Sequence, residues 1–364
     1  MWNQAAIYRR RRRTLAAGAG LVALLIIIIV LSGGGGPVKH VVKPAKLPTS
    51  SVPLSYTAAP QLSQAVTAAS VAPIPGEDAV TLLGGLDAGN AATATVATVS
   101  TTETKPVGTL PASLYGTAAV TIGKTEYLFG GREGTVTAQD GTPSGDVELG
   151  ILSYPPLESG AAVHEVAHLP DVNYGLGAAT VGGTAYIVGG NDGKHTLDTI
   201  LSWKPGEAKA KQVKTLPAPL RYAAVTAVGA NLVIAGGLLS SLAATRQVLV
   251  FDTKTGRLRK LRAQLPQALY AACGATLGKL AYVFGGAIPT ASGGIGSETG
   301  TIYSINPQSG VVAKAGTMPP RAFGACAATA KGSIFIAGGF ENALAINYVG
   351  RLTPLNAPKS KKAH

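Results

Sequence analysis

Leu280-Ala-Tyr-Val-Phe-Gly-Gly286 is an apolar, strand-like segment that ends in two glycines, and close equivalents of it recur along the chain. The equivalents AVTLLGG, TEYLFGG, TAYIVGG, NLVIAGG and SIFIAGG end at Gly85, Gly131, Gly190, Gly237 and Gly339. The first glycines of the six copies are residues 84, 130, 189, 236, 285 and 338, so the spacings are 46, 59, 47, 49 and 53 residues. A period of about fifty residues is typical of propellers and solenoids.

The residues around each copy predict four short strands per repeat. An aromatic residue lies about fifteen residues before the glycines of five copies, usually after an apolar-proline pair. A variable loop and a third strand with its exit turn, such as Val248–Gly256, follow the glycines, and a fourth strand leads to the next proline. Four strands with turn residues between them form one twisted antiparallel sheet. The aromatic residues are Tyr115, Tyr174, Tyr222, Tyr270 and Phe323.

This unit resembles the kelch repeat, and residues 52–355 are similar to kelch-type, galactose-oxidase-like propellers of a bacterial membrane-anchored type. The tryptophan that the family carries on its fourth strand is mostly absent. The resemblance implies an all-β, six-bladed propeller. Its double glycines are expected to be structural, because a sharp turn beside a neighbouring blade favours residues without a Cβ. They are Gly84, Gly85, Gly130, Gly131, Gly189, Gly190, Gly236, Gly237, Gly285, Gly286, Gly338 and Gly339.

The two ends of the repeat region are expected to complete one blade together. After Gly339 the chain has room for one clear further strand, at about residues 345–355. Val52–Thr57 precedes a proline as the outer strands of other repeats do. We therefore expect Val52–Thr57 to pair beside residues 345–355 and remove an exposed sheet edge.

The N-terminal residues predict a membrane anchor. Residues 1–14 contain five arginines, Arg9–Arg13, and Leu15–Ser32 is an apolar run of 18 residues, long enough to cross a bilayer as a single transmembrane helix. The arginines should remain cytoplasmic, which places the repeats on the extracytoplasmic side of the cell membrane. A cleaved signal peptide is the alternative, but its apolar core is normally shorter and precedes an A-x-A-like site. A twin-arginine export signal is the weaker alternative.

The charge distribution argues against nucleic-acid binding. The net charge is +13, but 11 of the 31 basic residues lie in Arg9–Arg13, Lys39–Lys46 and Lys359–Lys362, which leaves 20 against all 18 acidic residues. The basic tails suit membranes and topology better than a folded binding face. Residues 33–51 are predicted to be an extended linker and residues 356–364 a basic tail. We expect no nucleic-acid partner, no cofactor and a monomer.

Two patterns suggest metal chemistry that the predicted fold does not support. His164-Glu-Val-Ala-His168 matches the zinc motif HExxH, which requires both histidines on one helical turn. The repeat register places this segment on an outer strand, where residues four apart are separated by about 13 Å. Copper oxidation would need several converging ligands, and the repeats contain three histidines. We therefore expect no metal site.

Cys273 and Cys326 occupy the same register, twelve residues before their double glycines, on the inner strands of neighbouring blades. The favoured interpretation is a small core side chain at a crowded position. A disulfide is the alternative, because an oxidising exterior permits one where the Cα atoms lie within about 7 Å.

Acidic residues recur two positions after the double glycines, and two arginines precede inner strands. The loops after the glycines vary in length and should share one face of the propeller with the links between blades. The simpler interpretation is turn chemistry and interblade ion pairing, which the kelch resemblance also implies. The alternative is a polar pocket with aromatic platforms, a combination that binds sugars. The candidate ligand-binding residues are Glu133, Asp192, Arg221, Tyr222, Arg321 and Glu341.

A basic cluster marks the third turn and outer strand of blade four. Its residues are Lys254, Arg257, Arg259, Lys260 and Arg262. The favoured interpretation is a solvated edge that discourages association between sheets. Contact with anionic lipid or cell wall is the alternative.

These features favour a membrane-tethered, extracytoplasmic binding module for a glycan or protein ligand at the channel mouth, with no catalytic residue assigned. An enzyme that resembles the periplasmic kelch sialic-acid mutarotases is the alternative. A structural role within a membrane complex is a third hypothesis, because a fold does not determine a function.

We expect the chain to remain in the membrane fraction with its repeats outside. Protease added to intact cells should remove the propeller and leave a small N-terminal fragment, because Leu15–Ser32 holds that end in the bilayer. Immunoblotting against residues 1–14 measures this fragment. A mature chain that is free in the medium and begins near Gly33 would refute the anchor.

Overall fold

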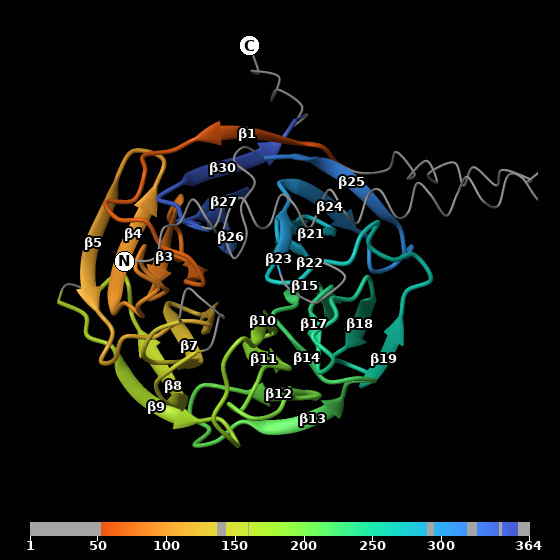
Figure 1. The fold of residues 1–364 in the computed structure, drawn as a ribbon, viewed down its shortest axis with the longest axis horizontal. Helices are drawn as coiled ribbons and strands as arrows, with labels where there is room; N and C mark the ends of the chain where they lie inside the picture. Colours follow the sequence, from red (N-terminus) through yellow and green to blue (C-terminus); the bar gives the residue numbers. More distant parts are fainter. Residues whose placement is uncertain are drawn as a thin grey trace, which may run out of the picture. The chain divides into compact units, whose positions relative to one another are not determined.

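Six four-stranded antiparallel sheets follow one another around a central axis (Figure 1). The computed structural model describes residues 52–136, 143–158, 160–289, 295–318, 326–341 and 344–355. These residues belong to the unit Leu47–His364, and the unit Met1–Lys46 lies outside them. The sheets are the blades of a six-bladed propeller, which confirms the predicted all-β fold.

In blades one to three the strands follow chain order from the axis to the rim. Blade one consists of β2 (Ser70–Pro73), β3 (Ala79–Leu83), β4 (Thr95–Ser100) and β5 (Thr104–Thr109). Blade two consists of β6 (Ala118–Ile122), β7 (Thr125–Arg132), β8 (Val147–Tyr154) and β9 (His164–His168). Blade three consists of β10 (Gly177–Val181), β11 (Thr184–Val188), β12 (Thr199–Trp203) and β13 (Lys211–Thr215).

Blades four to six complete the ring. Blade four consists of β15 (Ala224–Val228), β16 (Asn231–Ala235), β18 (Val248–Asp252) and β19 (Arg257–Lys260). Blade five consists of β20 (Cys273–Leu277), β21 (Leu280–Phe284), β24 (Thr301–Ile305) and β25 (Val312–Thr317). Blade six consists of β26 (Cys326–Ala330), β27 (Ser333–Ala337), β30 (Val349–Pro354) and β1 (Leu54–Ala58). Three short ribbons pair β14 (Leu220–Arg221) with β17 (Leu238–Leu239), β22 (Ala287–Pro289) with β23 (Ile295–Glu298), and β28 (Phe340–Glu341) with β29 (Leu344–Ala345).

The hydrophobic core lies between neighbouring blades. Six clusters of buried side chains each join two adjacent blades. Between blades two and three, the ring of Trp203 packs edge-to-face against that of Tyr127, with centroids 4.9 Å apart. Because both faces of a blade are covered, β3 and β27 are buried at all five positions and lack a polar face. This explains why the sequence shows continuous apolar runs rather than alternation.

The double glycines turn the chain where blades approach each other. All twelve have positive φ, which confirms their structural assignment. A Cβ at Gly84 would lie 2.3 Å from the carbonyl oxygen of Leu114, which belongs to the link to the next blade. Backbone atoms cannot move aside cheaply at this distance, so the turn requires glycine.

The two ends of the domain share blade six. Strand β1 pairs antiparallel with β30, from Leu54 opposite Pro354 to Ala58 opposite Gly350, which confirms the expected closure. A polar contact between blades six and one supports the closure, because the guanidinium of Arg351 donates to the carboxylate of Asp78 at 2.9 Å. The hydroxyl of Ser333 donates to the same carboxylate at 3.1 Å.

The remaining expectations concern the N-terminal helix, the segment His164–His168 and metal binding. The predicted transmembrane helix at Leu15–Ser32, the linker and the tail at residues 356–364 lie outside the described residues, which contain no helix long and apolar enough to cross a membrane. His164–His168 forms the outer strand β9, as the repeat register predicted. The described residues contain no group of three or more His, Cys, Asp or Glu placed to hold a metal ion.

Blade two carries a buried carboxyl group at its contact with blade one. The side chain of Glu126 is 1% exposed, and its Oε1 accepts a hydrogen bond of 2.7 Å from the hydroxyl of Thr81. Its Oε2 has no hydrogen-bond partner within the described part of the chain. Burial raises the pKa of Glu126 to about 8, although the bond from Thr81 acts in the opposite direction. The neutral acid is therefore the form that suits this site.

We expect the propeller to lose stability as the pH rises from about 4.5, the ordinary pKa of Glu126, to about 8. The folded chain holds a proton that the unfolded chain releases, and each pKa unit corresponds to about 1.4 kcal/mol. Glu126→Gln should flatten this dependence and raise the melting temperature at pH 8.5 by several degrees. Differential scanning calorimetry across this pH range measures both, with the exposed Glu158→Gln as the matched control. Equal profiles for both variants would contradict the assignment.

Candidate functional site

A ring of backbone hydrogen bonds links the blades around the central axis. Each bond joins two residues that lie two positions before the inner strands and have left-handed φ of 51° to 65°. In blades two to five the N–H of this residue donates to the carbonyl of its counterpart in the preceding blade, at 2.7 to 3.0 Å. The residues are Ala68, Gly116, Gly175, Tyr222 and Ala271. The counterpart in blade six falls within residues 319–325, outside the described residues.

A cavity of about 440 Å³ opens at this ring, on the face that carries the double-glycine loops. Its volume is typical of sites for small ligands. Most of the lining is apolar, and much of it comes from the ring residues and their neighbours along the chain. Its larger side chains are Asn90, Tyr115, Tyr174, Arg221, Tyr222, Leu238, Tyr270 and Phe340.

The tyrosine rings of blades two to four form a chain along the cavity wall. The rings of Tyr115 and Tyr174 meet edge-to-face with centroids 6.3 Å apart, and those of Tyr174 and Tyr222 do so at 6.4 Å. The guanidinium carbon of Arg132 lies 5.1 Å from the centroid of the Tyr174 ring. That of Arg221 lies 5.5 Å from the centroid of the Tyr222 ring. The two cations thus lie over aromatic faces, a favourable arrangement.

Blade four departs from the repeat by one residue. In blades two, three and five the tyrosine lies three residues before the inner strand, and it pairs with the residue after the double glycine. In blade four Arg221 occupies this position and pairs with Leu238, so Tyr222 takes the place of the left-handed ring residue. Tyr222 was expected at the same repeat position as the other tyrosines, and this alignment is wrong by one residue.

The shift places a large side chain where other blades have glycine or alanine. Tyr222 has a φ of 53°, which costs roughly 1–2 kcal/mol in a residue with a Cβ. Its ring lies over Gly175, where an added Cβ would come within 2.7 Å of the Tyr222 Cε1. Gly175 therefore makes room for the ring, and the strained Tyr222 belongs to the cavity rather than to a blade interior. Strained residues of this kind concentrate at functional sites.

Two polar groups at the cavity are buried without partners. The Nε of Arg221 and the hydroxyl of Tyr115 form no hydrogen bond within the described part of the chain. The guanidinium of Arg221 also forms no ion pair with another described residue. Burial raises the pKa of Tyr115 to about 12, and burial followed by the neighbouring Tyr174 raises that of Tyr222. Both hydroxyls are thus neutral at physiological pH, and Arg221 supplies a positive charge.

The six candidate residues separate into three groups. Arg221 and Tyr222 line the cavity, whereas Glu133, Asp192 and Glu341 are not among its lining residues. Arg321 lies outside the described residues. Whether any of them binds a ligand remains a prediction.

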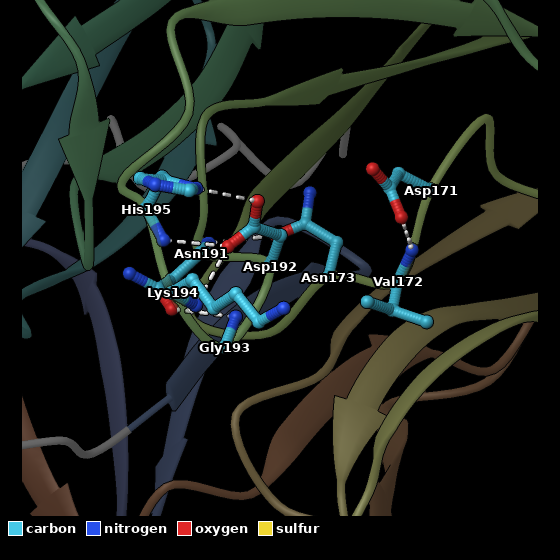
Figure 2. Close-up of polar contacts among 8 residues, drawn as sticks. All are labelled: Asp171, Val172, Asn173, Asn191, Asp192, Gly193, Lys194 and His195. Carbon is cyan, nitrogen blue, oxygen red and sulfur yellow. Dashed lines mark hydrogen bonds and ion pairs between the residues drawn. The ribbon is translucent and has the colours of Figure 1, made fainter.

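Asp192 organises its own loop, as Figure 2 shows. Its Oδ1 accepts hydrogen bonds from the amides of Lys194 at 2.7 Å and His195 at 2.5 Å, and its Oδ2 lies 3.3 Å from the Nδ1 of His195. Burial acts to raise the pKa of Asp192, but these hydrogen bonds outweigh it and lower the pKa. Asp87, at the same repeat position, likewise accepts the amides of Gly89 and Ala91. At both positions the simpler interpretation, turn chemistry, agrees with the structure.

Several cavity residues were missed as candidates. Tyr115, Tyr174 and Tyr270 share one repeat position, so their recurrence could have identified all three as lining residues. Phe340 follows the last double glycine, a position that other blades fill with different residue types, and the sequence carried no signal for it. Cys273 begins an inner strand and lines the cavity, and Cys326 begins the next inner strand, as their register predicted.

Comparison with known proteins supports the fold. No protein-family model matches the chain, and no curated protein sequence matches it. The chain is similar to the solved structure described as "Structure of YjhT", a kelch-type propeller, with a TM-score of 0.67 and 17% sequence identity. The similarity covers 82% of this chain and 97% of that chain. At this identity it shows a shared kelch-like propeller fold.

We expect Tyr222→Gly to leave the melting temperature nearly unchanged. The loss of ring contacts is offset by the relief of left-handed strain, since glycine adopts positive φ freely. Tyr282→Ala is the control, because Tyr282 is 1% exposed within β21 and such truncations cost about 3–5 kcal/mol. Thermal unfolding of the two variants compares them. If Tyr222→Gly melted as low as Tyr282→Ala, Tyr222 would be a structural residue.

Proposed function

We propose that the chain is a membrane-tethered, extracytoplasmic binding module whose central cavity receives a glycan or protein ligand. The observation that carries this proposal is the guanidinium of Arg221, which lines an aromatic cavity without an ion-pair partner among the described residues. Burying a charged group without a partner is unfavourable unless a ligand compensates it. The tether is supported by the apolar run Leu15–Ser32 behind five arginines.

The aromatic and planar groups of the cavity favour a sugar as the ligand. The rings of Tyr115, Tyr174 and Tyr222 offer apolar surfaces to the C–H face of a sugar, and their hydroxyls can exchange hydrogen bonds with it. Arg221 offers a planar set of donors for neighbouring oxygens. A ligand oxygen that reaches the Tyr115 hydroxyl or the Arg221 Nε would satisfy a polar atom left unpaired in the free chain.

The enzymatic alternative has less support from the described lining. General acid–base catalysis is most often performed by a carboxyl group or an imidazole within hydrogen-bond reach of the substrate. Among the described lining residues, neither Asp, Glu nor His is present. Binding without turnover is therefore the function that the geometry favours. If the chain increased the rate at which the anomers of a sugar interconvert, the mutarotase would be favoured instead.

We expect Arg221→Ala to weaken glycan binding without unfolding the propeller. Hydrogen bonds to a charged group are worth about 1.5–3 kcal/mol, so affinity should fall by roughly ten- to a hundredfold. A glycan array identifies a ligand for the wild-type chain, and isothermal titration calorimetry then compares the variants. The exposed Arg262→Ala is the control, and thermal unfolding monitors the fold. Unchanged affinity in Arg221→Ala, or a large loss of stability, would contradict the proposed site.

A further inference from the structure

The face opposite the cavity carries the short turns of every blade, and we call it the turn face. In blade three Val181 pairs with Thr184, and Ser202 pairs with Lys211, so residues 182–183 and 204–210 lie at the same end of the sheet. Blade four repeats this arrangement, because Val228 pairs with Asn231 and Asn231 with Asp252. The double glycines and the cavity lie at the other end of each blade.

The turn face is basic in blades three to five. Its turns and the first residues of its outer strands carry six exposed cations, Lys204, Lys209, Lys211, Lys254, Arg257 and Lys279. The two acids there are engaged in their own turns. Glu207 accepts hydrogen bonds from the amide of Lys204 at 2.9 Å and the Nζ of Lys211 at 3.1 Å, and Asp252 accepts the amide of Lys254 at 2.9 Å.

The same positions in blades one and two have the opposite charge. They carry Glu77, Glu103 and Glu158, against Lys124, and a fourth acid, Asp78, is paired with Arg351 of blade six. Protection of sheet edges would be needed on every blade, because every blade has an outer strand. Edge protection therefore does not explain why the turn face is basic in blades three to five and acidic in blades one and two.

The chain enters the propeller on this face. Ile334 lies at the start of β27, next to the turn that precedes this strand, and it pairs with Leu352 of β30. Leu54, the first residue of β1, pairs with Pro354 near the same end of β30, so β1 starts at the turn face. The hydroxyl of Tyr282 donates to the carbonyl of Val52 at 3.1 Å and holds this entry point near the turn of blade five. The 51 residues that precede Val52 contain the predicted anchor and a linker of residues 33–51. The attachment point and the basic turns thus share one face.

We propose that the turn face of blades three to five docks on the anionic headgroups of the bilayer that holds the chain, so that the cavity faces away from the membrane. The inference rests on the membrane tether proposed above. Basic residues near an anionic leaflet gain attraction that decays within a Debye length, and a short linker keeps the face close to its partner. Two copies paired face to face about a twofold axis would also match the acidic and basic halves, so a dimer in gel filtration would overturn the lipid assignment.

The test uses the full chain in lipid nanodiscs of phosphatidylcholine, with and without phosphatidylglycerol. Hydrogen–deuterium exchange of residues 204–211, 253–257 and 278–280 is the measurement. Exchange there should slow by at least about fivefold in the anionic discs at low salt, since each basic residue contributes about this factor to membrane partitioning. The slowing should disappear at about 1 M salt, where the Debye length is about 3 Å.

Two charge-reversal variants give the control. The triple variant Lys209→Glu, Lys254→Glu and Lys279→Glu should lose the slowing. The variant Lys194→Glu, Lys260→Glu and Arg262→Glu changes the net charge equally, but at exposed positions at the cavity end of the blades, and should keep it.

The remaining outcomes separate the two proposals. Retention in both kinds of disc with identical exchange rates would overturn the docking and leave the tether intact. Release from both kinds of disc during gel filtration would overturn the tether, and the docking with it. If soluble polyglutamate slowed hydrogen–deuterium exchange at the turn face and anionic discs did not, the surface would bind an anionic polymer, and the lipid assignment would be overturned.

Discussion

The hydrogen bonds between ring residues of successive blades impose the constraint on which the site depends. Each bond requires its residue to be left-handed so that one peptide N–H reaches the carbonyl of the preceding blade. Glycine and alanine meet this requirement at Gly116, Gly175, Ala68 and Ala271 without filling the axis. A cavity therefore remains where the inner strands begin, and the loops and tyrosines next to the ring become its wall. The cavity is thus a consequence of the fold itself.

Blade four uses this scaffold differently. Because of the one-residue shift, Arg221 occupies the position of the tyrosine in other blades, and Tyr222 occupies the position of their glycine or alanine. Tyr222 is therefore left-handed although it has a Cβ, which is unfavourable. The hydrogen-bonded ring tolerates the change, because its bonds are made by the backbone and Gly175 leaves space for the aromatic ring. A local departure from an otherwise regular repeat therefore supplies both the charge and the largest side chain at the ring. This is the pattern expected where function rather than folding selects the residues.

The sequence predicted best those features of the fold that few residue types can form. The double glycines predicted six blades, because backbones that approach within 2.3 Å of a would-be Cβ leave no alternative residue. The expected pairing of the N-terminal strand followed from the need to close a sheet edge. The site was predicted less well, because Asp87 and Asp192 serve loop turns with the same side chain that would serve a ligand. Spacing does show that Tyr222 is offset by one residue, since it lies 14 residues before Gly236 and the other aromatics lie 15 residues before their glycines. It did not predict the left-handed conformation of Tyr222, because a position in the repeat fixes a strand but not a φ angle.

Antiparallel order fixes the face of the propeller at which the N-terminal segment enters. In every blade the outer strand runs from the turn face toward the cavity face, because three reversals separate it from the inner strand, which runs from the cavity face. Strand β1 is the outer strand of blade six, so the segment before it must enter at the turn face whatever the linker contains. An N-terminal anchor on a propeller closed in this way starts on the side opposite the cavity. With the proposed anchor in a bilayer, the basic residues on this side, in blades three to five, would lie next to the headgroups, and the cavity would remain open to ligands from outside.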